Sequence, residues 1–206
     1  MKAVFMDYTG TTVQEKGPEI KEVVMRICKN SSLKDPGKVM ELWWTGLRKY
    51  EESSYLNTYL SEDEIVDRLL GEFQKEIQLE DNLEELHALI QGFWVNAPLF
   101  PDVISNNGVQ YVEKALAKHE LTPAGIVCAD MVHAYKPRKE IFEKALELCG
   151  CRADEVIHIG DSYSSDVQGA RAAGIKPVLI QRKGGDQAPD VLCIKDLSEI
   201  NFSLLL

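Results

Sequence analysis

The stretch that decides the fold is Lys2-Ala3-Val4-Phe5-Met6-Asp7-Tyr8-Thr9-Gly10-Thr11-Thr12. The run from Lys2 to Met6 is short and apolar, as expected of a strand buried on both faces of a parallel sheet. It ends in Asp7 and a glycine-containing loop, and ligands of open α/β sheets bind at such carboxyl ends of strands. This stretch therefore predicts an α/β protein with a polar site directly after its first strand.

Strand and helix patterns alternate in the second half of the chain. Short apolar runs predict strands over 126–128, 156–160, 177–180 and 191–194. Helical patterns predict helices over 109–118, 140–149 and 166–173, the last of them stopped by Gly174. This alternation is typical of a parallel sheet with helices on its faces, so we expect a three-layer, Rossmann-like core.

Between these parts the chain reads as helix after helix. Ile20, Val23, Val24, Ile27 and Cys28 form one amphipathic stripe, and Ser61-Glu62-Asp63-Glu64 is typical of a capping box that opens a further helix. Four helical patterns without an intervening strand predict a helical bundle over 15–97, inserted into an α/β core made of 1–14 and 98–206.

Composition disfavours several classes of function. The formal charge of −10 over 206 residues disfavours nucleic acid or an anionic membrane as the main partner. No apolar stretch approaches the ~18 residues that a membrane span needs. The five cysteines are scattered without a zinc-ligand spacing, as expected of reduced thiols, and we expect a cytoplasmic protein.

Two acidic residues far apart in sequence, Asp7 and Asp161, each follow a predicted buried strand. Parallel strands open on one edge of the sheet, so the two carboxylates are expected to converge there. A hard divalent cation would offset their repulsion, and magnesium favours one or two carboxylates together with substrate phosphate. Asp166, five residues beyond Asp161, either adds charge to the same site or orients a metal-bound water.

Two further places suit an anion. Ser105-Asn106-Asn107-Gly108 leads into a predicted helix, whose N-terminus offers backbone N–H groups. Lys136, in Tyr135-Lys136-Pro137, precedes another helix and is placed to neutralise a phosphate or a nucleophile. Taken singly, the Ser105 turn is more often just a helix N-cap, and a lysine such as Lys136 is more often a solvated surface residue. The combination with three aspartates favours a site.

The set resembles the haloacid dehalogenase superfamily. Its four motifs occur in order as Asp7-Tyr8-Thr9-Gly10-Thr11, Ser105-Asn106, Lys136-Pro137, and Gly160-Asp161-Ser162 with Asp166, and the inserted helices are similar to the family's helical cap. The resemblance implies that Asp7 attacks phosphorus and forms an aspartyl-phosphate. It implies Mg2+ bound by Asp7, Asp161 and the Thr9 carbonyl, with Asp166 as a direct or indirect ligand. Catalytic roles would fall to Asp7, Lys136 and Ser105, and substrate binding to Thr9, Thr11, Ser105, Asn106, Lys136 and Arg48.

One position departs from the common phosphatases of this superfamily, which carry a second aspartate two residues after the nucleophile as acid and base. Here that position is Thr9, and loss of such a group costs about 10²–10⁴ in rate. We therefore expect a slow phosphatase or phosphotransferase acting on a small phosphorylated metabolite, as a monomer or homodimer. Two alternatives are a 2-haloacid dehalogenase and a phosphonoacetaldehyde hydrolase; a third is a catalytically weak regulatory or binding protein.

A second departure lies just ahead of Ser105. The family has a helix and then a strand between the return from the cap and this serine, but only Ile104 separates Ser105 from Pro101-Asp102-Val103. A parallel crossover needs about a dozen residues or more. Either the protein has lost that helix and most of a central strand, or a segment is missing near 103–104, which is the interpretation we favour.

Overall fold

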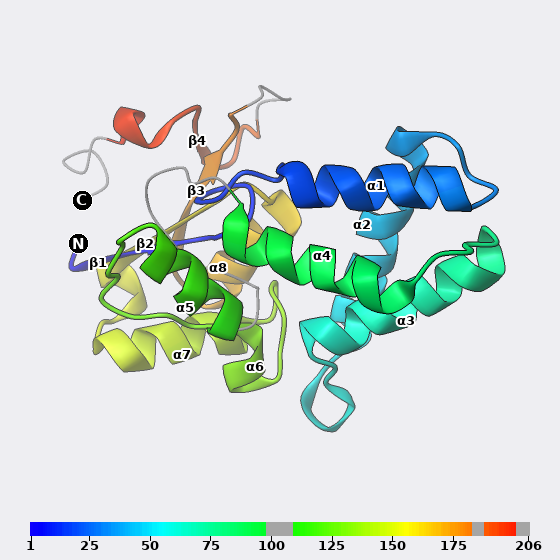
Figure 1. Cartoon of the computed structure of the whole chain (residues 1–206). Helices are drawn as coiled ribbons and strands as arrows, with labels where there is room; N and C mark the ends of the chain where they lie inside the picture. Colours follow the sequence, from blue (N-terminus) through cyan, green and yellow to red (C-terminus); the bar gives the residue numbers. More distant parts are fainter. Residues whose placement is uncertain (98–108, 183–187, 201–206) are drawn as a thin grey trace.

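The computed structural model describes residues 1–97, 109–182 and 188–200. Its sheet has four strands, all parallel, in the order in which they occur along the chain. These are β1 (Ala3–Met6), β2 (Val156–Gly160), β3 (Lys176–Ile180) and β4 (Leu192–Ile194). Every residue of β2 is buried, as expected of a strand covered on both faces. The predicted parallel α/β sheet is confirmed (Figure 1).

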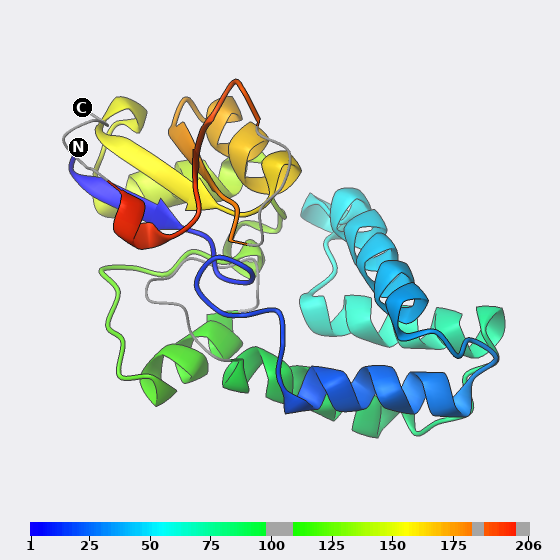
Figure 2. The ribbon, with the colours of Figure 1, turned by 90° about the horizontal axis from the view of Figure 1, so that it is seen from above.

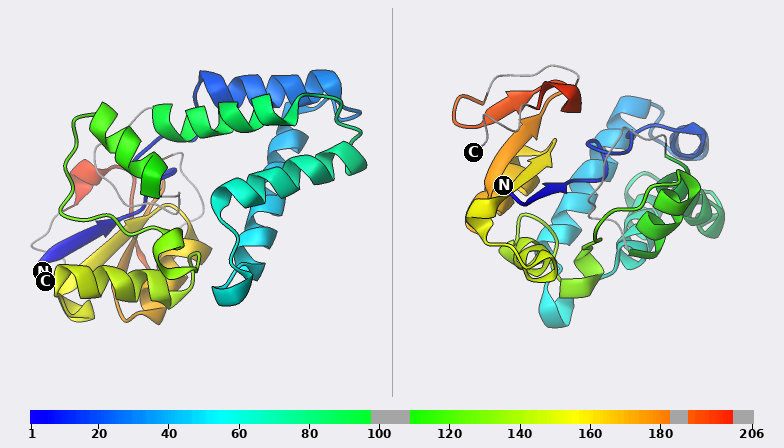
Figure 3. Two further views of the ribbon diagram at one scale, coloured as in Figure 1. Left: turned by 60° about the horizontal axis from the view of Figure 1, so that its bottom comes forward. Right: turned by 90° about the vertical axis from the view of Figure 1, so that its left-hand side faces the viewer.

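The two faces of the sheet pack against different elements. Helices α7 (Lys139–Cys149) and α8 (Gln168–Ala172) cover one face, where Phe5 and Val156 contact Ile141, Phe142 and Ala170. Figure 3 shows α7 along this side of the strands. The opposite face presents an apolar cluster from Met6 through β2 and β3, against which Leu197 and Ile200 pack. Alternation of side chains along each strand explains this division.

Four helices lie beside the sheet rather than on it (Figures 1 and 2). They are α1 (Pro18–Asn30), α2 (Pro36–Ser53), α3 (Glu62–Glu76) and α4 (Leu83–Asn96). Side chains cap three of their N-termini: Asp35 accepts from two backbone N–H groups of α2, Asn82 does so for α4, and Ser61 with Glu64 forms the predicted capping box of α3.

These helices share one apolar core with the segment that follows them. Ile65, Leu69 and Leu86 are fully buried in it, and α5 (Val109–Lys118) contributes Val112 and packs beside α4. Tyr8, next to Asp7, also enters this core, and its hydroxyl donates to the carbonyl of Trp94 at 3.1 Å. The first loop is therefore attached to both the sheet and the helices.

Two sequence predictions need correction. Residues 126–128 do not form a strand; Val127 and Cys128 are buried by side-chain packing alone, without a ladder of hydrogen bonds. In the described parts of the chain, β1 pairs only with β2, so no strand stands beside it to receive this segment. The helix expected over 166–173 instead begins with a π-helical turn over Tyr163–Val167 and continues as α8.

The remaining helical segments are short: α6 (Ala129–Val132), and 3-10 turns over Leu56–Thr58, Ala153–Glu155 and Leu197–Glu199. The interruption predicted near 103–104 lies outside the described residues. Over the ranges that the structure covers, none of the helices has the length and apolar character to cross a membrane.

Candidate active site

The register of the sheet brings two aspartates to one edge. Met6 is paired with Ile159, and the Asp7 backbone N–H donates to the carbonyl of Ile159 at 2.8 Å. Asp7 and Asp161 therefore leave neighbouring parallel strands at the same end, as predicted from the sequence. Asp7 is buried, whereas Asp161 is partly exposed.

The loop after Asp7 is tight and depends on Gly10. The Gly10 N–H donates to the carbonyl of Val13, and the Thr12 hydroxyl donates to the carbonyl of Asp7 at 2.6 Å. Gly10 has a φ of 87°, a conformation that favours glycine, and a Cβ there would lie 2.2 Å from a carboxylate oxygen of Asp161. The glycine thus lets the two motifs approach each other closely.

Lys136 joins the first and last motifs. Its ammonium donates to a carboxylate oxygen of Asp7 and, at 2.6 Å, to one of Asp166, and all three side chains are buried. Burial alone would lower the pKa of Lys136, but the adjacent Asp166 and Asp7 charges raise it above its ordinary value. Lys136 is therefore a permanent cation between two carboxylates.

Asp166 is the most firmly held carboxylate of the site. It accepts hydrogen bonds from Lys136 and from the Ser162 backbone N–H at 3.0 Å, and lies 2.9 Å from Nε2 of the buried His158. Although burial opposes ionisation, the charge of Lys136 and the contact with His158 hold the pKa of Asp166 well below its usual range. Gly160 allows this packing, since a Cβ there would lie 2.1 Å from the Asp166 carboxyl carbon.

His158 was not singled out by the sequence analysis. The signal was available, because an imidazole inside the otherwise apolar run Val156-Ile157-His158-Ile159 needs a polar partner once buried. Its ring also contacts Phe142 edge-on at a centroid distance of 5.0 Å. His158, a residue of β2, thus helps to hold the Asp166 carboxylate in position from within the sheet.

The three aspartates are suited to a hard cation. Asp7, Asp161 and Asp166 each offer a carboxylate oxygen within 4.8 Å of the others. Burial, followed by the charges of Asp166 and Glu15, raises the pKa of Asp161 to about 7. Burial also raises the pKa of Asp7, which Lys136 opposes and Asp166 and Asp161 reinforce. Burial and the neighbouring carboxylates disfavour the ionised forms of Asp7 and Asp161, and a divalent ion such as Mg2+ would offset both effects.

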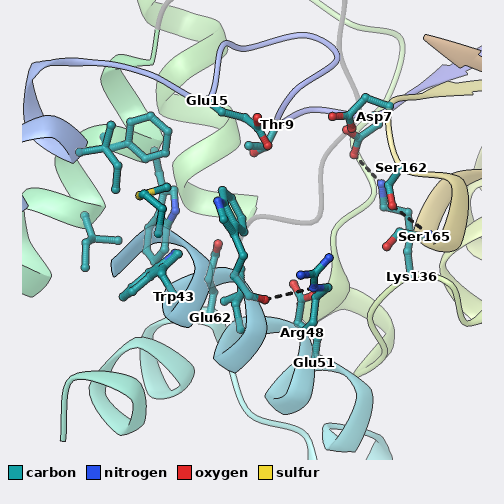
Figure 4. Close-up of a pocket in the computed structure, with 18 of the residues that line it drawn as sticks. Asp7, Thr9, Glu15, Trp43, Arg48, Glu51, Glu62, Lys136, Ser162 and Ser165 are labelled. Carbon is teal, nitrogen blue, oxygen red and sulfur yellow. Dashed lines mark hydrogen bonds and ion pairs between the residues drawn. The ribbon is translucent and has the colours of Figure 1, made fainter. Parts of the chain in front are cut away.

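A cavity of about 440 Å³ opens between this edge of the sheet and the helices. Figure 4 shows Asp7 and Lys136 on one side of it, and Trp43, Arg48 and Glu51 of α2 on another. The helical wall is mainly apolar and includes Ile20, Met40, Trp43, Trp44, Leu47, Ile90, Phe93 and Trp94. The cavity therefore offers a charged floor and a largely apolar wall to one small molecule.

The structure brings most of the predicted site residues together. Asp7, Thr9, Arg48, Lys136, Asp161 and Asp166 all line the cavity. Thr11 does not line it: its side chain is fully buried, and its carbonyl accepts from Arg182 at 2.9 Å. Ser105 and Asn106 lie outside the described residues. Sequence reasoning missed Glu51, because nothing local distinguishes it from the other glutamates on helix surfaces.

Comparison with known proteins identifies the class. Residues 1–174 match the haloacid dehalogenase-like hydrolases, so this chain is a hydrolase and belongs to that family. A zebrafish (Danio rerio) haloacid dehalogenase-like hydrolase domain-containing protein 3 is 40% identical over 62 residues, 30% of this chain and 26% of that protein. A glyceraldehyde 3-phosphate phosphatase of Methanothermobacter thermautotrophicus is 29% identical over 83 residues, 36% of this chain and 37% of that protein. The matched parts thus span well under half of these curated relatives.

Solved structures agree on the fold. A HAD phosphatase from Thermococcus onnurineus has a TM-score of 0.69 at 22% identity, covering 99% of this chain and 98% of its own. The L-2-haloacid dehalogenase of Xanthobacter autotrophicus has a TM-score of 0.73 at 17% identity, covering 90% and 80%. A Bacillus subtilis HAD-hydrolase bound to magnesium has a TM-score of 0.72 at 20% identity, covering 98% and 97%. At these identities the likeness concerns the fold, and neighbours of both activities share it.

Proposed function

We propose that this protein is a Mg2+-dependent phosphatase or phosphotransferase that acts on a small phosphorylated metabolite through an aspartyl-phosphate on Asp7. The observation that carries the proposal is the convergence of Asp7, Asp161, Asp166 and Lys136 at one edge of the sheet, inside a single cavity. A relative that is a glyceraldehyde 3-phosphate phosphatase supports a phosphorylated substrate. Two acidic residues beside the nucleophile favour the metal-dependent reaction over dehalogenation.

Each residue has a defined task in this reaction. An oxygen of the Asp7 carboxylate attacks phosphorus and displaces the leaving oxygen. Lys136, held in place by Asp166, neutralises charge on the transferred phosphoryl group. The carboxylates of Asp7 and Asp161 and the Thr9 carbonyl would hold Mg2+. When bound, this ion would stabilise the phosphoryl oxygens as a Lewis acid. Asp166 then serves mainly to position Lys136, as its direct contact indicates.

The helices α1–α4, within the proposed cap of residues 15–97, close the cavity over this machinery and select the leaving group through their apolar wall. Arg48 is exposed at the cavity and is proposed to contact the substrate there. The strongly negative net charge supports a small-molecule substrate rather than nucleic acid. We propose a monomer or homodimer in the cytoplasm, in line with the scattered, odd-numbered cysteines.

The test is direct. The protein is incubated with p-nitrophenyl phosphate or acetyl phosphate, with Mg2+ or with a chelator, and phosphate release and phosphoaspartate are followed by colorimetry and mass spectrometry. We expect turnover that needs Mg2+, a phosphoryl group on Asp7, and no activity in Asp7→Asn. Asp154→Asn, an exposed residue ahead of the N-terminal end of β2, is the matched control. Halide release from a 2-haloacid without metal, or equal activity of Asp7→Asn and wild type, would refute the proposal.

A further inference from the structure

Hydrolysis of a phosphate ester through Asp7 needs a group that gives a proton to the leaving oxygen and later takes one from water. Thr9 occupies the nearby position, and a threonine hydroxyl does not exchange a proton easily near neutral pH. Lys136 is committed as a cation to Asp7 and Asp166. The cavity lining also includes three glutamates, Glu15, Glu51 and Glu62, and one of these is placed for the task.

Glu51 lies on the last turn of α2, where this helix is fastened to the loop that carries Lys136. Tyr55 forms a β-bridge with Ala134, and the Leu56 N–H donates to the carbonyl of His133 at 3.1 Å. Arg138, two residues after Lys136, donates to the carbonyl of Glu52 at 3.0 Å and lies over the ring of Tyr55 at 4.1 Å. These contacts, all made by residues that follow Glu51, hold the end of α2 against the loop that carries Lys136, and Glu51 and Lys136 line the same cavity.

The carboxyl of Glu51 is available to a substrate. Within the described part of the chain it forms no hydrogen bond or ion pair, although it is partly buried and lines the cavity with Asp7 and Thr9. Three charged groups act on it: Lys136 across the cavity, and Arg48 and Glu52 on its own helix. Burial raises the pKa of Glu51 to about 7, against the effects of Lys136 and Arg48, so both protonation states are populated at neutral pH.

We propose that Glu51 is the general acid and general base of this enzyme. Thr9 leaves this role unfilled, and the Glu51 side chain supplies it from helix α2. This inference rests on the proposed phosphatase function. It places a glutamate of the helical unit in contact with the leaving oxygen of the substrate, on the side of the cavity opposite Lys136.

The two half-reactions balance with Glu51 alone as the proton carrier. In the first, an Asp7 oxygen bonds to phosphorus, the bond from phosphorus to the leaving oxygen breaks, and the Glu51 proton moves to that oxygen, so that an alcohol departs. In the second, the oxygen of water bonds to phosphorus, the bond from phosphorus to Asp7 breaks, and Glu51 takes a proton from that water. Inorganic phosphate leaves, Asp7 is a carboxylate again, and Glu51 is again protonated.

The experiment compares Glu51→Gln with wild type on two substrates in the presence of Mg2+. Ethyl phosphate has a poor leaving group that needs a proton, and p-nitrophenyl phosphate has a good one that does not. On ethyl phosphate we expect kcat of the variant to fall about 10²–10⁴-fold with KM little changed. On p-nitrophenyl phosphate we expect a burst of nitrophenol equal to the enzyme concentration, followed by slow turnover and accumulation of phosphorylated Asp7.

Two further variants keep the test decisive. Glu52→Gln alters the neighbouring exposed glutamate and is expected to behave as wild type. Thr9→Asp in the Glu51→Gln background is expected to restore at least tenfold in kcat, because a carboxyl then stands beside Asp7; a merely misfolded variant would not recover. An unchanged kcat, a loss confined to KM, or the absence of a burst would overturn the role of Glu51. Absence of turnover and of phosphoaspartate in wild type would instead overturn the proposed function itself.

Discussion

Replacing Glu51 by Gln is expected to stabilise the protein by an amount that grows with pH. The pKa of Glu51 is about 7 in the folded protein against 4.5 for an ordinary glutamate, because burial disfavours the charged form. A raised folded-state pKa means that the stability associated with this group is fully present below about pH 4.5 and is lost as the pH rises through 7. Glutamine stays neutral throughout and does not incur this loss.

The magnitude follows from linkage. The difference between these two pKa values corresponds to about 3 kcal/mol when each pKa unit is worth about 1.36 kcal/mol. The gain of Glu51→Gln in the free energy of unfolding is therefore expected to be about 1 kcal/mol at pH 5 and about 3 kcal/mol at pH 8. The charges of Asp7, Asp161 and Lys136 are present in both proteins, so most of their effect cancels in the comparison.

Urea denaturation of wild type and Glu51→Gln at several pH values between 5 and 8, in a metal-free buffer, measures this difference. The control is Glu52→Gln, which makes the same substitution at the neighbouring, exposed position of α2 and is expected to change the free energy of unfolding by less than about 0.5 kcal/mol. A Glu51→Gln difference that stays constant from pH 5 to 8, or that falls with rising pH, would refute the claim that burial suppresses ionisation of this carboxyl. This measurement does not depend on any substrate.

Other consequences concern the loop, the lysine and the helical unit. Gly10→Ala is expected to lower the free energy of unfolding by about 1–2 kcal/mol, because alanine disfavours the positive φ of this position. Its added Cβ would also displace the Asp161 carboxylate, so Mg2+ affinity measured by calorimetry is expected to fall at least tenfold. Equal Mg2+ affinity would contradict the close approach of Gly10 and Asp161. Lys136→Met should lose about 3–5 kcal/mol in metal-free urea titrations, since it leaves two buried carboxylates facing each other, and Mg2+ should raise its Tm more than that of wild type. An equal Mg2+ effect on both proteins would count against a metal site there. Tyr111→Phe removes the hydroxyl that donates to both oxygens of Asp63 at 2.8 Å, and should lower stability by about 1.5 kcal/mol without changing kcat; a change in kcat would mean that this contact also shapes the cavity.

Some of the molecule could be foreseen from local patterns. The β1 run is apolar, and the run that ends at Gly160 is apolar except for His158. Helical stripes such as that from Ile20 to Cys28 have a period that only a helix satisfies. The capping box at Ser61 was predicted and is present, because its two hydrogen bonds join residues three positions apart. Such features depend on neighbours in sequence and are therefore legible in one chain.

The strand predicted over 126–128 shows where this reasoning stops. Its apolar character was interpreted correctly, since Val127 and Cys128 are buried, but a strand needs a hydrogen-bonded neighbour that local sequence does not specify. The early start of the turn before α8 has a similar origin. Here the Ser162 hydroxyl accepts from the Ser165 N–H, and Asp166 is drawn toward Lys136 and His158, so that contacts from distant elements reshape the turn.

The sequence by itself predicted the parallel sheet, a run of helices between the first two strands of that sheet, and the grouping of Asp7, Asp161, Asp166 and Lys136. These follow from periodicity, from the ends of apolar runs, and from four motifs in order. Only the tertiary structure decided that Thr11 is buried away from the cavity, that His158 contacts Asp166, and that Glu51 lines the same cavity as Asp7 and Lys136. The reason is physical. The burial of a side chain and the charges around it are set by residues that can lie more than a hundred positions away in sequence, as Lys136 and Asp7 do. Burial and neighbouring charge in turn determine the pKa of a carboxyl group.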